Sequence, residues 1–166
     1  MDIVKANLQD VPAIMDIISN CIITMESQGL YQWNEYYPDS NTIEEDIKGG
    51  HAHVIRDGDN YMAYVAINSL QSPEYSSVKW LTEGDNVLVV HRLSVHPSYQ
   101  GMGLGKKMLK FIEDEGKNNN YQSIRLDTYS ENTTSNKLYE KYGYQKTGEI
   151  FFEYKDLPFY CYEKTL

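Results

Sequence analysis

A cluster of glycines between an apolar strand and an amphipathic helix constrains this chain more than any other feature. The segment Gln100–Gly105, QGMGLG, holds three glycines in five residues and follows Pro97 and a strand expected over Asn86–Val95. It enters a helix expected over Gly103–Glu115. Because glycine weakens a helix, its repetition here indicates a backbone that turns with positive φ or lies close to a ligand. The unpaired N–H groups of a helix start predict a phosphate or pyrophosphate as that ligand.

Two common glycine motifs do not match this segment. A Walker A loop needs Gly-Lys followed by Ser or Thr, whereas Lys107 follows Lys106 here. A dinucleotide-binding Rossmann fingerprint needs a third glycine where Lys106 stands, and it belongs at the first strand–helix turn. The segment lies in the second half of the chain, so neither motif explains it.

The rest of the chain predicts a mixed α/β domain of the α+β type over residues 1–166, with no linker or repeat. Strands are expected over Asp2–Ala6, His51–Arg56, Asn60–Ile67, Tyr121–Thr128, Tyr144–Glu149 and Phe159–Glu163, and helices over Asp10–Met25, Thr42–Lys48 and Thr133–Tyr142. Asp10 is the expected cap of the first helix, and Gly116 and Gly143 are expected helix stops. Ser69–Asp85 is a polar connection with little pattern. The elements form one central, twisted, mostly antiparallel sheet with helices on both faces.

The acidic charge of the chain limits the classes of molecule that it is expected to bind. The net charge of -9 disfavours nucleic acids and anionic membranes, and it suits a cationic partner or simply keeps the protein soluble. The longest aliphatic run, Val87–Val90, is too short to span a bilayer. Cys21 and Cys161 form neither a metal motif nor a disulfide framework, and the histidines lack metal-ligand spacing. No metal is expected, and without a secretory signal a cytoplasmic location is expected.

The glycine segment and its surroundings resemble one enzyme superfamily. The pattern Q/R-x-x-G-x-G/A is matched at each fixed position by Gln100, Gly103 and Gly105. The longer stretch Leu93–Gly105 resembles the strand, proline turn and pyrophosphate loop of the GNAT N-acetyltransferases.

A second motif downstream strengthens that resemblance. Asn132 and the stretch Tyr139–Tyr144 resemble the ending N-x-x-A-x-x-x-Y-x-K-x-G-F of the same superfamily. Ser135 replaces the alanine and Tyr144 the phenylalanine, and both departures are mild. The order of the expected elements also fits the GNAT fold, so the resemblance covers nearly the whole chain.

The resemblance implies that acetyl-CoA binds in a V-shaped opening between the splayed strands over Val87–Val95 and Tyr121–Thr128. Main-chain groups of the first strand pair with the pantetheine arm, and the loop's N–H groups hold the pyrophosphate. The implied cofactor-binding residues are Leu93, Ser94, Val95, Gln100, Gly101, Met102, Gly103, Leu104, Gly105, Lys106, Asn132, Asn136 and Tyr139. Asn132 also has an ordinary reading as a helix cap, and both readings stay open.

Direct transfer of the acetyl group to an amine is the implied reaction. By resemblance Tyr139 protonates the departing CoA thiolate and an N–H near Val95 stabilises the oxyanion. A packing role for Tyr139 stays open. His91 is the candidate base, because strand alternation places it with Leu93 and Val95, although a hydrogen-bonded core histidine is an equal alternative. Other candidate bases are Glu83 and Asp85, and Arg92 is expected to pair with a carboxylate on the opposite face.

The acceptor site is expected from the end of the first helix and the loop after it, at Glu26, Tyr31, Trp33 and Tyr36. Aromatic rings interleaved with carboxylates hold alkylammonium groups, although such rings also cover cores or form dimer contacts. The acceptor is a primary amine of a small molecule or a protein amino group. A non-catalytic acyl-CoA-binding or sensing module and a protein N-terminal acetyltransferase are the alternatives. A homodimer is also compatible with the superfamily.

Overall fold

A computed structural model describes residues 1–166 as two compact units. The first unit comprises Met1–Ile67 and His91–Met108, and the second comprises Asn68–Val90 and Leu109–Leu166. Strand β4 (Val87–Val95) and helix α3 (Leu104–Asn118) each contribute residues to both units. The seven strands follow the order β1-β2-β3-β4-β5-β7-β6, and the succession of helices and strands along the chain confirms the sequence prediction. None of the helices combines the length and the apolar character that crossing a membrane requires.

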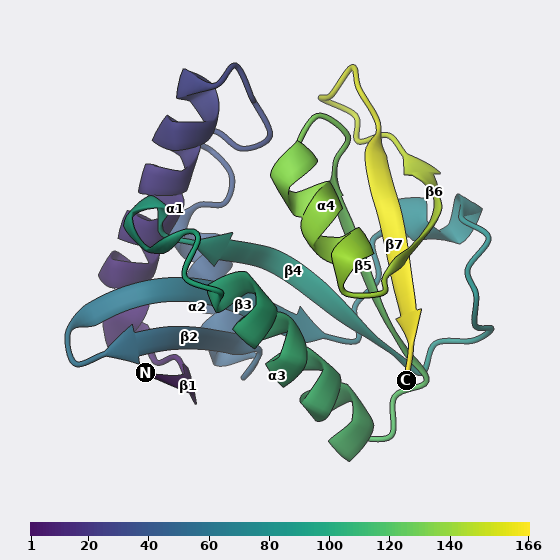
Figure 1. The fold of residues 1–166 in the computed structure, drawn as a ribbon, viewed down its shortest axis with the longest axis horizontal. Coiled ribbons are helices and arrows are strands. Elements are labelled where there is room, and N and C mark those ends of the chain that lie inside the picture. The colour runs from purple at the N-terminus through teal and green to yellow at the C-terminus, as the bar shows by residue number, and fades with distance from the viewer. The chain divides into compact units, whose positions relative to one another are not determined.

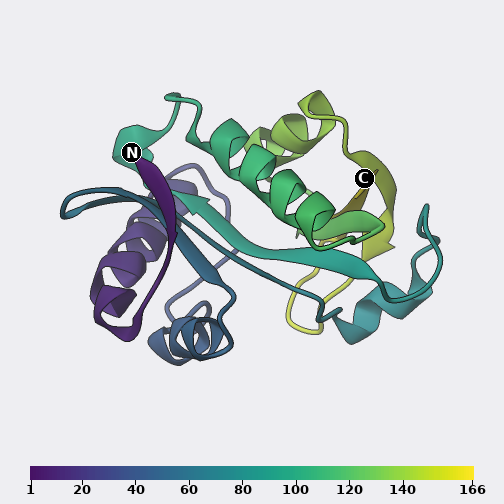
Figure 2. The same ribbon diagram turned by 90° about the horizontal axis from the view of Figure 1, so that it is seen from below.

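The first unit is built on an antiparallel meander of β1 (Asp2–Lys5), β2 (Ala52–Asp57) and β3 (Asn60–Asn68). A tight turn joins β2 to β3, because Asp57 pairs with Asn60. Helices α1 (Val11–Ser27) and α2 (Ser40–Lys48) lie together on one face of these strands (Figure 2).

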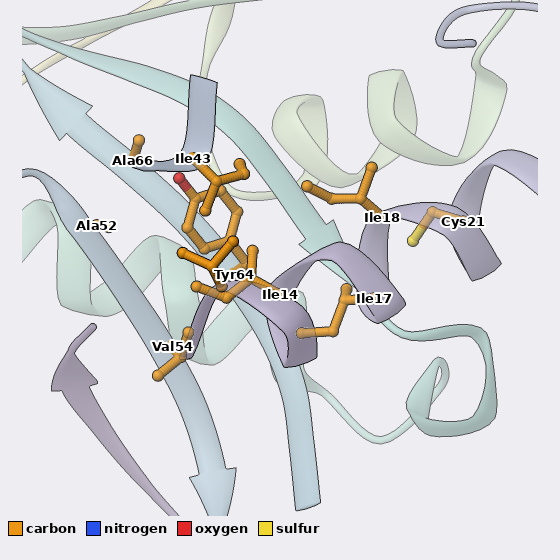
Figure 3. Packing of buried hydrophobic residues seen from close by; sticks show 10 residues of the cluster. Ile14, Ile17, Ile18, Cys21, Ile43, Ala52, Val54, Tyr64 and Ala66 are labelled. Atoms are coloured by element: carbon orange, nitrogen blue, oxygen red, sulfur yellow. The ribbon is translucent and has the colours of Figure 1, made fainter. Parts of the chain in front are cut away.

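The core of this unit lies between α1, α2 and the strands. Ile14, Ile17 and Ile18 of α1 are completely buried, lie on one face of the helix, and pack with Ile43 and Tyr64 (Figure 3). Each such side chain contributes about 1.5–3 kcal/mol through burial, so this face fixes the position of α1.

The start of α1 differs from the prediction in one detail. Asp10 precedes the helix, but its side chain makes no capping hydrogen bond to it. Instead Asp10 Oδ2 accepts from the N–H of Asn7 at 2.8 Å, and Oδ1 accepts from the Tyr61 hydroxyl at 2.5 Å. The carboxylate therefore joins the preceding turn to β3, which a local capping rule does not anticipate.

The second unit is built on β5 (Ser123–Tyr129), β6 (Gln145–Ile150) and β7 (Phe159–Thr165). Strand β7 pairs antiparallel with both neighbours, and its pairing with β5 runs from Ser123 to Tyr129. The parallel pairing of β5 with β4 is much shorter and covers only Ser123–Arg125. Helix α4 (Thr133–Lys141) lies beside β5 and β7 (Figure 1).

The connection over residues 69–85 is more ordered than its sequence predicts. It contains a 3-10 helix over Pro73–Ser77 whose Tyr75 is buried. The Tyr75 ring packs against Trp80 with 4.9 Å between centroids, and the Trp80 indole N–H donates to the Tyr75 carbonyl at 3.0 Å. Tyr75 belongs to the apolar core of the second unit, together with Val87, Val89, Ile150, Phe159 and Cys161. The connection thus packs against β4, β6 and β7 within the second unit.

The two glycines expected to stop helices behave differently. Gly143 follows α4 with φ +86°, which confirms it as a left-handed stop. The prediction for Gly116 is wrong, because α3 continues to Asn118 and the left-handed residue is Asn120 at φ +59°. A Cβ on Gly116 would lie 2.5 Å from Leu166 Cδ1, so this glycine permits close packing instead.

Candidate active site

The glycine segment follows β4 in the first unit and is shaped by local hydrogen bonds. His96 Nδ1 accepts from the N–H of Ser98 at 3.1 Å and caps the 3-10 helix Pro97–Tyr99. The Gln100 side chain donates back to the Val95 carbonyl at 3.1 Å. These bonds fix the direction in which the chain leaves β4.

Gly101 and Gly103 both occupy the left-handed region, with φ of +82° and +78°. A Cβ built on either one meets nothing within 4 Å, so backbone conformation and not crowding requires glycine there. Helix α3 begins directly afterwards, and its first turn closes with the Lys107 N–H on the Gly103 carbonyl at 3.0 Å. The segment therefore presents a bare backbone in front of a helix start, where N–H groups favour an anion.

Arg92 breaks the regular run of β4. It has φ +56° although it is not glycine, and its guanidinium donates to both carboxylate oxygens of Asp46 at 2.9 and 2.5 Å. The pairing with a carboxylate confirms the prediction for Arg92. The left-handed conformation interrupts the two-residue alternation on which the assignment of His91 to one face with Leu93 depends. His91 is partly exposed, and its role as a base stays a prediction.

The end of β4 carries the groups expected to meet pantetheine. The Val95 carbonyl accepts from the Cys21 thiol at 3.2 Å as well as from Gln100, and burial raises the pKa of that thiol to about 11. Ser94 is buried and donates to the Arg92 carbonyl at 2.9 Å. Because the Val95 carbonyl already accepts these two hydrogen bonds, the expected pairing with the pantetheine arm would use the Val95 N–H and the main chain of the partly exposed Leu93.

The predicted acceptor residues lie at the end of α1 and in the following loop of the same unit. Glu26 is exposed, and Tyr31 and Tyr36 are 60% and 78% exposed. Trp33 is partly buried. The loop is shaped by Asn34, whose side-chain oxygen accepts from the N–H of Tyr36 at 2.8 Å. Two exposed aromatic rings and an exposed carboxylate therefore lie in this part of the chain, and their contact with an acceptor stays a prediction.

In the second unit, two asparagines organise α4. Asn132 Oδ1 accepts from the Ser135 N–H at 3.1 Å, which confirms Asn132 as the helix cap. Asn136 is buried and donates to the Tyr129, Ser130 and Asn132 carbonyls. Its oxygen accepts from the Tyr162 hydroxyl at 2.7 Å. Asn136 thus ties α4 to the strands, while its contact with a cofactor stays a prediction.

Tyr139 lies on α4 and is only 6% exposed. Its ring packs edge-on against Tyr144 at 5.9 Å and tilted against Tyr162 at 5.7 Å. Burial, with the negative charge of Asp127 adding to it, raises the pKa of the Tyr139 hydroxyl above its ordinary value. The hydroxyl therefore keeps its proton at neutral pH, as a proton donor must.

Asp127 is a site candidate that the sequence reasoning missed. It lies in the middle of β5, and its Oδ2 accepts from the Tyr75 hydroxyl at 2.6 Å. Burial raises the pKa of Asp127 to about 6, the Tyr75 hydrogen bond opposes this rise, and the charge of Glu74 adds to it. The available signal was the polar side of β5, which Asp127 shares with Ser123 and Arg125 in a central strand.

The comparisons with known proteins agree with this geometry. Residues 13–144 match the family model described as "Acetyltransferase (GNAT) family". The chain belongs to the GNAT acetyltransferase family. Over 143 residues this GNAT chain is 24% identical to the uncharacterized N-acetyltransferase YesJ of Bacillus subtilis (strain 168), covering 84% of this chain and 79% of that protein.

Solved GNAT structures share the fold. The GNAT family acetyltransferase of Streptococcus agalactiae matches with a TM-score of 0.88 and 26% identity, over 99% of this chain and 95% of that one. An acetyltransferase from Salmonella typhimurium, solved with its cofactor acetyl-CoA, matches with a TM-score of 0.73 and 20% identity over 99% and 93% of the two chains.

This GNAT protein is therefore an acetyltransferase that uses acetyl-CoA as its acetyl donor. The residues of the first unit fit the cofactor, because left-handed Gly101 and Gly103 leave open space directly before the start of α3. The N–H groups of that helix start suit the diphosphate, and Lys106 adds positive charge in the sequence. When bound, acetyl-CoA supplies the acetyl thioester.

Proposed function

We propose that this GNAT acetyltransferase moves the acetyl group of acetyl-CoA to a primary amine of a small molecule or a protein by direct attack of the amine. The observation that carries the proposal is the glycine segment, where two open, left-handed glycines precede α3. A conformation this restricted, at a helix start, is expected where a diphosphate must lie against bare backbone.

Three further features support an amine as the acceptor. The relative YesJ is named an N-acetyltransferase. The loop after α1 displays Tyr31 and Tyr36 close in sequence to the exposed carboxylate of Glu26. The chain also carries a net charge of -9, which attracts cationic molecules. Rings and carboxylates of this kind hold alkylammonium groups through cation–π contact and charge.

The catalytic roles follow from chemistry at named atoms. The amine must lose its proton before it attacks, because an alkylammonium has no free electron pair and a pKa of about 10. A main-chain N–H near Val95 is the donor proposed for the developing oxyanion. The Tyr139 hydroxyl, which retains its proton at neutral pH, is the donor proposed for the departing thiolate.

The experiment combines release of free thiol with cofactor binding. Purified protein is given acetyl-CoA and a panel of alkylamines, polyamines, aminoglycosides and peptides, with matched alcohols as controls. The proposal expects thiol release with at least one class of amine and none with the alcohols. Binding of acetyl-CoA without thiol release on any amine would instead indicate a non-catalytic binding module.

A matched pair of variants tests the glycine segment itself. Gly103→Val and Gly84→Val introduce the same side chain at φ +78° and +86°, both with nothing within 4 Å. Similar backbone strain is therefore expected in both, but only Gly103→Val should weaken acetyl-CoA binding, by about tenfold or more in calorimetry. Equal cofactor affinity in the two variants would contradict the proposed diphosphate site.

A further inference from the structure

We propose that Asp127 binds the ammonium group of the acceptor and takes its proton, which makes the amine neutral for acetyl transfer. This inference rests on the proposed function and deepens it. It assigns the base to β5 in the second unit, a residue that neither the sequence motifs nor the resemblance points to.

The position of the carboxylate supports this role. Asp127 is set into the sheet but remains partly exposed, so a ligand can reach it. The Asp127 side chain accepts one hydrogen bond, from the Tyr75 hydroxyl to Oδ2 at 2.6 Å. Oδ1 is therefore able to accept from a ligand. Tyr75 is itself buried and holds the carboxylate in a fixed orientation.

Asp127 also forms no salt bridge within the protein. Arg125, two residues away on the same strand, is paired with Glu163 at 3.1 Å and lies over the Trp80 ring at 4.4 Å. Lys155, on the connection between β6 and β7, lies 6.0 Å from the centre of the Tyr129 ring. Because a carboxylate that is shielded from most of the solvent and has no salt-bridge partner is unfavourable, an incoming ammonium ion would gain both charge pairing and a hydrogen bond there.

The surroundings of Asp127 suit the carbon part of an alkylammonium. Its cross-strand neighbour Cys161 belongs to an apolar cluster with Tyr75 and Phe159. The partly buried rings of Tyr129 and Phe152 pack on Phe159, with centroids 5.2 and 4.8 Å away. Aromatic faces attract alkylammonium ions, so the cluster favours an amine over a neutral alcohol.

The titration of Asp127 matches the task of a base. Burial raises its pKa to about 6, so it is charged at neutral pH and still basic enough to accept a proton. In the transfer, one N–H bond of the ammonium breaks, an O–H bond forms on Oδ1, and the nitrogen regains its electron pair. Water then takes the proton from Asp127.

The ionisable neighbours of Asp127 come from three elements. The 3-10 helix contributes Glu74 and Tyr75, α4 contributes Tyr139, and β7 contributes Cys161. The residues of β4 and β6 in the same cluster are apolar, namely Val87, Val89 and Ile150. Any pH dependence of this site therefore depends chiefly on Asp127 and on the charge of Glu74.

The first experiment compares Asp127→Asn with wild type on two kinds of acceptor. At near-neutral pH n-butylamine and 2-phenylethylamine are protonated, whereas methoxyamine is largely neutral and needs no base to release its electron pair. We expect kcat/KM of Asp127→Asn to fall about a hundredfold or more for the alkylamines and only a few-fold for methoxyamine. Asp114→Asn, at an exposed site on α3, is the control and should match wild type.

The second experiment follows the carboxyl itself. In protein carrying ¹³C-labelled aspartate, a signal missing from Asp127→Asn should titrate near pH 6. Tyr75→Phe removes a hydrogen bond that lowers this pKa, so the titration and the acidic limb of kcat/KM should both move to higher pH. Glu74→Gln removes a charge that raises it, so both should move to lower pH.

The outcomes separate the two proposals. If wild type binds acetyl-CoA but acetylates no amine, the proposed function fails and this inference falls with it. If wild type acetylates alkylamines while Asp127→Asn keeps the same rate and pH profile, only the inference is overturned. If His91→Gln loses the acidic limb of kcat/KM while Asp127→Asn retains it, the inference is likewise overturned, and the role of base returns to His91.

Discussion

Two acidic side chains on neighbouring strands of the second unit have opposite surroundings. Glu163 on β7 accepts from the Ser123 hydroxyl at 2.6 Å, the Leu81 N–H at 2.5 Å and Arg125 at 3.1 Å. Asp127 on β5 accepts from Tyr75 alone. In the strand pairing, Arg125 is opposite Glu163 and Asp127 is opposite Cys161, so the two carboxylates lie close in the ladder.

The difference is visible in their acidity. Burial alone would raise the pKa of Glu163, but its hydrogen bonds hold that pKa below its ordinary value. Burial raises the pKa of Asp127 because a single hydroxyl is too weak to oppose it. A buried carboxylate with a full set of donors stabilises the fold, whereas one left short of donors retains the capacity to bind a cation or a proton.

The largest expected effect is from Glu163→Gln. It leaves the guanidinium of Arg125 buried without its countercharge, so we expect the free energy of unfolding to fall by about 3–5 kcal/mol. Urea denaturation at neutral pH measures this. The double variant Arg125→Met with Glu163→Leu removes both charges and should recover most of the loss. A single-variant loss below about 1 kcal/mol would show that the pair is not structural.

Asp127→Asn should have the opposite sign. Because the pKa of folded Asp127 is raised to about 6 from an ordinary 3.8, its charged form is disfavoured in the folded state. That penalty is present above pH 6 and disappears as the pH falls below about 4. Near pH 8 we therefore expect the variant to be more stable than wild type by about 1–3 kcal/mol, with no difference in acid. Thermal unfolding across this pH range checks it, and a destabilised variant near pH 8 would contradict it.

A smaller gain is expected from Tyr144→Phe. The Tyr144 hydroxyl is buried and has no hydrogen-bond partner, which is the same shortage seen at Asp127 but in a group without charge. Removing it should raise the free energy of unfolding by about 1 kcal/mol. Phenylalanine is also the residue of the GNAT ending at this position. Urea denaturation that shows a clear loss would mean that the hydroxyl is bonded in solution.

The smallest effect is expected where a carboxylate is exposed. Asp114 pairs with Lys110 one helical turn away at 3.0 Å, with both side chains more than half exposed. Asp114→Asn should change the free energy of unfolding by less than about 0.5 kcal/mol, and added salt should reduce even that. A larger change would show that solvent exposure does not explain why Asp114 and Glu163 are expected to contribute differently to the free energy of unfolding.

The features predictable from sequence were those set by neighbours along the chain. A glycine needed for a left-handed backbone can be recognised from the residues next to it. The turn at Gln100–Gly105 and the helix stop at Gly143 were therefore predictable from the sequence. The helix expected over Asp10–Met25 is present as α1 (Val11–Ser27). Each of these depends on the residue type and on positions a few residues away.

The features that sequence did not predict depend on distant segments. Gly116 was misread because its role comes from packing against Leu166, fifty residues later. Asp127 was missed because its surroundings come from Tyr75 and Glu74, in a connection whose sequence shows no periodicity. The left-handed conformation of Arg92 is held by Asp46, which no local rule connects to β4.

That last arrangement limits how the acceptor loop can be redesigned. One guanidinium holds both the bent part of β4 and the end of the loop, because Arg92 also donates to the Tyr37 hydroxyl at 3.0 Å. Tyr64 completes the anchor by donating to Asp46 at 2.5 Å. A loop grafted from another GNAT enzyme must therefore bring its own anchor or keep a tyrosine at position 37, since otherwise the graft and the bend in the strand will no longer share a fixed point.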